Sequence, residues 1–132
     1  MKIAIPLFGS WVSPRFGYSS EVWVLNVKDS EVVSQKTVSM VGMPLPFWLS
    51  QFAYLGIDVL ICGGIDQASH RKLEYLGISV MPEIAGDAIE VLELFLAGKL
   101  EPGFRKCKRK SRGFKGKKGR YIEQHWTVDD KK

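Results

Sequence analysis

The order in which apolar spacing changes along this chain is its strongest constraint on the fold. The first forty residues contain three β-rich segments, at 3–8, 22–27 and 32–38, and a short polar stretch typical of a hairpin turn separates the last two. After them, helical spacing alternates with short apolar runs at 58–62 and 78–81. This βββαβαβα order predicts an α/β fold with a mixed five-stranded sheet and three main helices.

Three segments have the spacing of helices and end before a glycine, a common residue just past a helix. They are residues 45–55 before Gly56, residues 67–76 before Gly77 and residues 88–97 before Gly98. Asp66 stands where the second helix needs an N-cap, because a short carboxylate accepts hydrogen bonds from the free N–H groups of a first turn. The pattern therefore predicts where each helix ends and how the second one begins.

Composition divides the chain into a folded part and a basic part. The chain has 132 residues, which suits a single domain. Residues 1–104 contain 7 Lys and Arg against 11 Asp and Glu, a net charge of −4, whereas residues 105–132 contain 12 against 3, a net charge of +9. We therefore expect a domain over 1–103 and a basic, flexible C-terminal tail over 104–132, because the tail's composition cannot build a core.

The sequence also limits where the protein is expected to act. It has no run of 18 or more apolar residues and no recognisable secretory signal, so we expect no membrane segment and a cytoplasmic location. Its two cysteines, Cys62 and Cys107, form neither a disulfide framework nor a CxxC metal motif. The oligomeric state stays open at this point.

Two glycine-bearing loops are expected at one edge of the sheet. Residues 9–17 follow the first strand, and Gly63 and Gly64 follow the fourth. Because these strands are expected to be parallel neighbours, their carboxyl ends open onto the usual ligand crevice of an α/β sheet. The N-terminus of the following helix and the guanidinium of Arg15 would suit an anionic ligand there. The alternative is two ordinary turns and a surface arginine, since no dinucleotide or P-loop fingerprint occurs.

Five segments, in order, resemble the dinitrogenase iron–molybdenum cofactor biosynthesis family. They are residues 2–6, 12–17 (VSPRFG), 55–65, 73–78 and 95–100. The resemblance covers about residues 1–100 and implies an RNase H-like fold with sheet order 3-2-1-4-5, strand two running antiparallel. It also implies a carrier of iron–sulfur or molybdenum-containing clusters, with cluster donor and acceptor proteins as partners, which can be isolated without its cluster.

The loops and the resemblance together predict a cofactor-binding crevice. Its expected residues are Ser13, Arg15, Phe16, Gly17, Cys62, Gly63 and Gly64. Several relatives have His before the Phe-Gly of the first loop, where this chain has Arg15, so an imidazole ligand is missing and Arg15 would instead hydrogen-bond to a cluster's anionic surface. Cys62 is the expected metal ligand, because iron and molybdenum–sulfur centres accept a soft thiolate. The alternative for Cys62 is a small buried side chain.

Catalysis is not expected. Two-metal phosphoryl chemistry needs clustered carboxylates, but the first strand carries none, and Asp58 and Asp66 alone do not make the set. No Ser/His/Asp or Cys/His arrangement is evident either. One cysteine cannot supply the four thiolates of an iron–sulfur site, so the leading hypothesis is a non-catalytic carrier or chaperone for a preformed metal–sulfur cluster.

Two other function classes stay open. Clustered cations interleaved with aromatic residues can bind nucleic-acid phosphates and stack on bases, or dock on an acidic partner. The cations concerned are Arg105, Lys106, Lys108, Arg109, Lys110, Arg112, Lys115, Lys117, Lys118 and Arg120. Large apolar residues around a Pro-Leu-Pro turn indicate either an exposed interaction patch or the ordinary buried face of the first helix. These residues are Met40, Met43, Leu45, Phe47 and Trp48.

Overall fold

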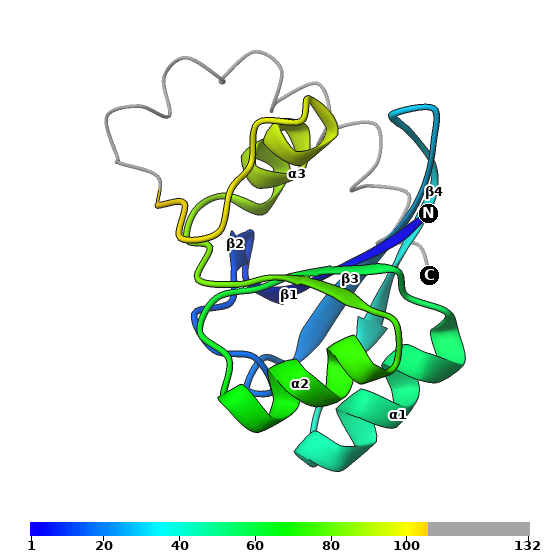
Figure 1. The fold of residues 1–132 in the computed structure, drawn as a ribbon, viewed down its shortest axis with the longest axis vertical. Helices are drawn as coiled ribbons and strands as arrows, with labels where there is room; N and C mark the ends of the chain where they lie inside the picture. Colours follow the sequence, from blue (N-terminus) through cyan, green and yellow to red (C-terminus); the bar gives the residue numbers. More distant parts are fainter. Residues whose placement is uncertain (106–132) are drawn as a thin grey trace.

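Helices lie on both faces of one mixed sheet in the computed structural model, which describes residues 1–105 (Figure 1). The strands are β1 (Lys2–Phe8), β2 (Trp11–Val12), β3 (Glu21–Lys28), β4 (Glu31–Ser39), β5 (Val59–Ile61) and β6 (Ser79–Met81). The helices are α1 (Leu45–Leu55), α2 (Gln67–Tyr75) and α3 (Ala88–Leu96). Helices α1 and α2 cover one face of the sheet, and α3 covers the other.

The sheet has the order β4-β3-β1-β5-β6. Strand β3 runs antiparallel to β1 and β4, whereas β1, β5 and β6 are mutually parallel. This is the predicted order 3-2-1-4-5, so the expected fold class is confirmed. The sequence analysis missed β2, which pairs antiparallel with the end of β1 through Phe8 and Trp11. A two-residue strand is too short to leave a periodic pattern in a sequence.

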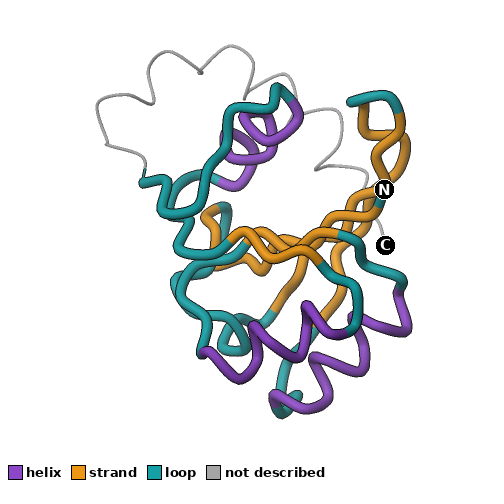
Figure 2. Tube along the Cα trace, viewed as in Figure 1, coloured by secondary structure: helices purple, strands orange, loops and turns teal. Residues whose placement is uncertain are grey.

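Alternate residues of the central strands build two separate cores. Ile3, Ile5 and Leu7 of β1 pack under α3, whereas Ala4 packs on the side of α1 and α2. Strand β1 is therefore buried on both faces, as its continuous apolar run predicts. The loops after β1, β5 and β6 gather at one end of the sheet (Figure 2), which is the edge where a ligand site is expected.

Capping residues explain where the helices begin and end. The Asp66 carboxylate accepts from the N–H of Ser69 at 2.9 Å and so caps α2, as predicted. The structure adds a second such cap, Asp87, whose carboxylate accepts from the N–H groups of Ile89 and Glu90 at the start of α3. Gly56 ends α1 with a φ of 73°, which favours glycine.

The predictions for the basic tail and for the apolar stretch before α1 can be compared with the structure only in part. Residues 106–132 lie outside the described residues, so Arg105 alone of the ten predicted docking cations is described, and the tail and the nucleic-acid alternative stay predictions.

At the turn before α1, Met40 and Trp48 are buried, whereas Met43 and Phe47 are exposed. That stretch is therefore divided between core and surface. No helix within residues 1–105 is long and apolar enough to cross a membrane.

Candidate functional site

The two glycine loops are joined by their backbones. The N–H of Phe16 donates to the carbonyl of Gly64 at 2.8 Å, and the N–H of Gly64 donates to the carbonyl of Pro14 at 2.7 Å. Arg15 and Gly64 thus form a parallel bridge beyond the end of the β1–β5 pairing. These bonds hold the first loop against the second, so Arg15 projects from a fixed wall rather than from a free turn.

A third loop, between β6 and α3, completes this edge of the sheet. The N–H of Glu83 donates to the carbonyl of Gly63 at 2.9 Å, and the N–H of Ile84 donates to the carbonyl of Cys62 at 2.9 Å. Glu83 has a φ of 59°, in the left-handed region that an L-residue rarely adopts. The surrounding hydrogen bonds hold it there, and its side chain is exposed beside the other two loops.

Gly63 serves the contact between loops rather than a ligand. A Cβ on Gly63 would lie 2.5 Å from the carbonyl oxygen of Ser13 and 2.6 Å from that of Pro14. Only glycine allows the two backbones to approach this closely. Of the two glycines expected in the crevice, Gly64 lines the pocket described below and Gly63 does not.

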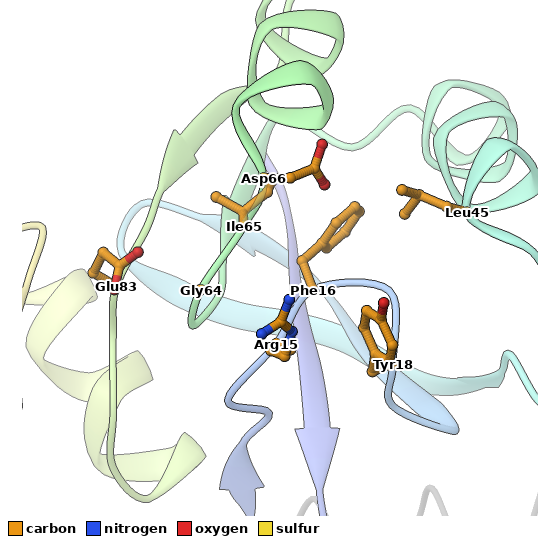
Figure 3. A pocket seen from close by; sticks show the side chains of 8 residues that line it. All are labelled: Arg15, Phe16, Tyr18, Leu45, Gly64, Ile65, Asp66 and Glu83. Carbon is orange, nitrogen blue, oxygen red and sulfur yellow. The ribbon is translucent and has the colours of Figure 1, made fainter.

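The three loops and the start of α1 surround an open pocket of about 490 Å³ (Figure 3). Its lining combines apolar side chains with three charged ones and comprises Arg15, Phe16, Tyr18, Leu45, Gly64, Ile65, Asp66 and Glu83. Leu45 and Glu83 lie at opposite ends of the view, with Arg15 and Phe16 between them. The Arg15 guanidinium lies over the Tyr18 ring, 5.3 Å from its centroid, which is within the range of a cation–π contact.

The charges in this pocket differ from the sequence-based expectation of an anion site. Hydrogen bonds from the side chain and backbone of Ser69 lower the pKa of Asp66, so this carboxylate is ionised at neutral pH. It caps the first turn of α2, where an anionic ligand was expected to sit. Glu83 adds a second carboxylate, and Arg15 is the one guanidinium of the lining. The pocket is therefore mixed in charge rather than cationic.

Cys62 lies in the core and does not line the pocket. It has no exposed surface and packs in the cluster beneath α1 and α2. Burial, and secondarily the nearby charge of Glu83, raises the pKa of its thiol from about 9 to about 12. A ligand thiolate must be both deprotonated and accessible, and Cys62 as folded here is neither. The structure thus favours the interpretation of Cys62 as a small buried side chain.

The other predicted residues divide between pocket and scaffold. Arg15, Phe16 and Gly64 line the pocket. Ser13 is buried, and its hydroxyl donates to the Arg15 carbonyl at 3.2 Å. Gly17 has a φ of 91° and allows the first loop to turn beneath Leu45, whose Cδ1 would lie 2.8 Å from a Cβ there. Ser13 and Gly17 therefore shape the loop and leave the contact with a ligand to their neighbours.

Five lining residues were missed as site residues, for different reasons. They are Tyr18, Leu45, Ile65, Asp66 and Glu83. Asp66 was recognised as a helix cap but not as a pocket charge. Glu83 follows β6 at the same carboxyl edge, so the rule that located the other two loops could also have pointed to it.

A protein-ligated metal centre does not fit the described residues. Within residues 1–105, no group of three or more His, Cys, Asp and Glu side chains is arranged to hold a metal ion. His70 faces Glu74 on α2, with 3.2 Å between its Nε2 and the carboxylate. What the pocket offers a metal–sulfur species is hydrogen bonding from Arg15 and contact with an apolar wall.

Comparison with known proteins places this fold among relatives. A family described as "Dinitrogenase iron-molybdenum cofactor" matches residues 1–98. An uncharacterized protein of Methanocaldococcus jannaschii, MJ0580, is 27% identical over 107 residues, covering 76% of this chain and 90% of that protein.

Two solved structures have the same fold. PH0822 superposes with a TM-score of 0.73 at 24% identity, over 77% of this chain and 94% of that one. The apo form of the orange protein from Desulfovibrio gigas superposes with a TM-score of 0.61 at 21% identity, over 74% and 88%. These identities establish the fold alone, but the family match spans most of the described residues. The chain belongs to the dinitrogenase iron-molybdenum cofactor family.

Proposed function

We propose that this protein is a non-catalytic carrier that holds an iron–sulfur or molybdenum-containing metal–sulfur cluster as cargo between a donor and an acceptor protein. The observation that carries the proposal is the family match over residues 1–98. The proposed binding site is the pocket, which is supported by its position at the edge where ligands bind in open α/β sheets. The cluster is the substrate of this transfer and not a resident cofactor.

Arg15 is the residue best placed to recognise such cargo. Its guanidinium presents a planar set of N–H donors, which can hydrogen-bond to several acceptors on an anionic surface at once. The joined loops fix its backbone, and Tyr18 restrains its side chain. Phe16, Leu45 and Ile65 add apolar contact, which reduces competition from water.

The absence of an accessible thiolate within residues 1–105 suits a carrier. Cys62 is the single cysteine of this part of the chain, and it is buried. A cluster held through hydrogen bonds and packing can leave without breaking a bond between its metal and a cysteine of the protein. Asp66 and Glu83 oppose an anionic cargo, so they weaken its binding and favour release to an acceptor.

The test is acquisition of a cluster by the full chain under anaerobic conditions. The probes are tetrathiomolybdate, a simple molybdenum–sulfur anion, and separately ferrous iron with sulfide. We expect charge-transfer absorption and metal that stays with the protein through gel filtration. Arg15→Gln should lose most of this metal, whereas Arg71→Gln, an exposed arginine of α2 outside the pocket, should not.

Two results would contradict the proposal at different levels. If the parent protein acquires no metal from either probe, the carrier function is wrong. If the parent binds and both arginine variants bind equally well, the function stands but the site is elsewhere.

A further inference from the structure

A second hollow of the surface lies at the amino end of β1, which we call the amino-end groove. It has a volume of about 310 Å³ and is lined by residues of β1, β3 and β4, namely Lys2, Val24, Asn26, Ser34, Gln35 and Lys36. The loops around the first pocket lie at the opposite, carboxyl end of β1 (Figure 1). The amino-end groove is therefore separate from the proposed cluster site.

The strand register places the polar side chains of the groove in a row. Lys2 pairs with Asn26, and Asn26 pairs with Ser34, so these three directly opposed residues share one face of the sheet. Val24 and Lys36 form a further pair on that face, because side chains alternate along a strand with a period of two. Val24 packs in the cluster beneath α1 and α2. Three neighbouring strands thus bring two ammonium groups, an amide and a hydroxyl to one face.

The Lys2 ammonium is held at the edge of the groove. Its Nζ donates to the carbonyl of Leu55, in the last turn of α1, at 2.9 Å. An ammonium has three N–H donors, so this bond leaves two for a ligand. The Asp58 carboxylate accepts from the backbone N–H of Lys2 at 2.9 Å and does not line the groove. Within residues 1–105, neither Lys2 nor Lys36 forms an ion pair with an acidic side chain.

The charge of the groove is opposite to that of the domain around it. Residues 1–104 carry a net charge of −4, yet two of their seven Lys and Arg line this one groove. The first pocket includes Asp66 and Glu83, whereas the lining of the groove includes no acidic residue. Two neighbouring cations repel each other, and an anion between them is attracted to both. The amino-end groove therefore suits an anion.

We propose that the amino-end groove binds a phosphate group, either as free phosphate or as the terminal group of a small monoester. A phosphate group carries about two negative charges at neutral pH and three strong acceptor oxygens. These match the two ammonium groups and the Asn26 and Ser34 donors, whereas a carboxylate has one charge and two oxygens. A volume of about 310 Å³ is near the lower end of the range for ligand sites and suits a small anion.

The experiment is a titration of the full chain with inorganic phosphate, followed by ¹H–¹⁵N NMR at low salt in a phosphate-free buffer. Signals of the Asn26 side-chain amide and of the Ser34 and Lys36 backbone amides should shift and saturate. We expect a dissociation constant of about 1 mM, as for a few exposed charge-assisted contacts. Residue-resolved signals separate the groove from the ten cations of residues 105–120, which also attract anions.

A second probe distinguishes the two sources of the phosphate group. Adenosine monophosphate carries the same group on a nucleoside. Tighter binding of this probe at the groove would identify a nucleotide as the ligand, and equal or weaker binding would identify free phosphate. Either result supports a phosphate site, because both probes act through the same group.

A matched pair of charge variants tests the assignment to the groove. Lys36→Gln should weaken phosphate binding there about fivefold through loss of one ammonium group. Lys99→Gln removes the same charge at an exposed position outside the groove and should leave binding within about twofold of the parent. Ser34→Ala should weaken binding by a smaller factor than Lys36→Gln. Thermal unfolding reports whether each variant is folded.

Three outcomes would overturn the proposal. The first is the absence of shifts at the groove while signals of residues 105–120 move, which would make the basic segment the phosphate site. The second is equal weakening by Lys36→Gln and Lys99→Gln, which would show attraction to net charge alone. The third is the same shifts with sodium chloride at matched ionic strength, which would indicate an adventitious ion only.

Discussion

The three loops at the carboxyl edge of the sheet contain two groups of neighbouring residues with different roles. The first group, which we call the seam, is the backbone contact of Ser13 and Pro14 with Gly63, which is close enough to exclude a Cβ on Gly63. The second group, which we call the rim, consists of Arg15, Asp66 and Glu83, the charged residues that line the pocket. The comparison teaches that a sequence motif need not have one function: the seam fixes geometry, and the rim sets the charge that a ligand meets. Seam substitutions should therefore change stability, and rim substitutions should change affinity.

The largest expected effect is in the seam. Gly63→Ala places a Cβ against two carbonyl oxygens at 2.5 and 2.6 Å, so the loops must separate. We expect the free energy of unfolding to fall by about 3 kcal/mol, as for other overpacked sites. Urea denaturation measures it, and Gly64→Ala is the matched control, because its Cβ would meet the Pro14 oxygen at 3.3 Å. An equal loss of unfolding free energy in the two variants would show that the close contact at Gly63 does not determine stability.

The next effect appears in the pH dependence of stability. The Cys62 thiol keeps its proton in the folded state up to a pKa of about 12, whereas the unfolded thiol loses it near 9. The unfolded chain therefore binds fewer protons above pH 9, so stability falls as pH rises, by up to about 1.4 kcal/mol per pH unit from this group. Cys62→Ala should show a shallower fall than the parent between pH 9 and 11. Identical slopes would mean that the thiol is not buried as described.

Asp66 belongs to both halves of the comparison, because it caps α2 and also faces the pocket. Asp66→Ala should cost about 1 kcal/mol in the free energy of unfolding through loss of the cap, and at the same time tighten binding of an anionic probe. Asp66→Asn keeps a capping oxygen and should tighten binding with a smaller loss of stability. A loss of stability with no change in affinity would place Asp66 outside the binding site.

Glu83 should act on affinity alone. Its side chain is exposed at the pocket, so Glu83→Gln should leave thermal unfolding close to that of the parent. Removing one opposing charge should tighten tetrathiomolybdate binding about fivefold, or about 1 kcal/mol. Equilibrium dialysis at low salt measures this, and Glu74→Gln on α2 is the control for net charge. Weaker binding by the Glu83 variant would show that this carboxylate assists the ligand.

The fold was largely predictable because it depends on long periodic patterns. The apolar runs of β1 and β3, together with helices ended by glycines such as Gly56, indicated the elements, and the family resemblance supplied their order in the sheet. Strand β2 could not be predicted, because its pairing of Phe8 with Trp11 depends on the turn at Gly9 rather than on a pattern.

The site was predictable in position but not in residue detail. The carboxyl-edge rule pointed to Arg15 and Gly64, and both line the pocket. It could not decide whether Cys62 faces the pocket or the core, because that depends on what covers the end of β5. Leu60 of β5 and Cys62, which directly follows the strand, both pack beneath α1 and α2. Glu83 follows the carboxyl end of β6, so the same rule could have included it, but its left-handed backbone conformation leaves no signal in the sequence.

The most direct test of the account compares Arg15→Gln with Cys62→Ser in one binding measurement. Tetrathiomolybdate affinity is measured by equilibrium dialysis under anaerobic conditions, with thermal unfolding as the check that each variant is folded. If the rim holds the cluster, Arg15→Gln binds at least about tenfold more weakly than the parent, as expected for a lost charge-assisted contact, and Cys62→Ser binds like the parent. Loss of binding in folded Cys62→Ser, with Arg15→Gln unchanged, would contradict the account and make the buried thiol the ligand.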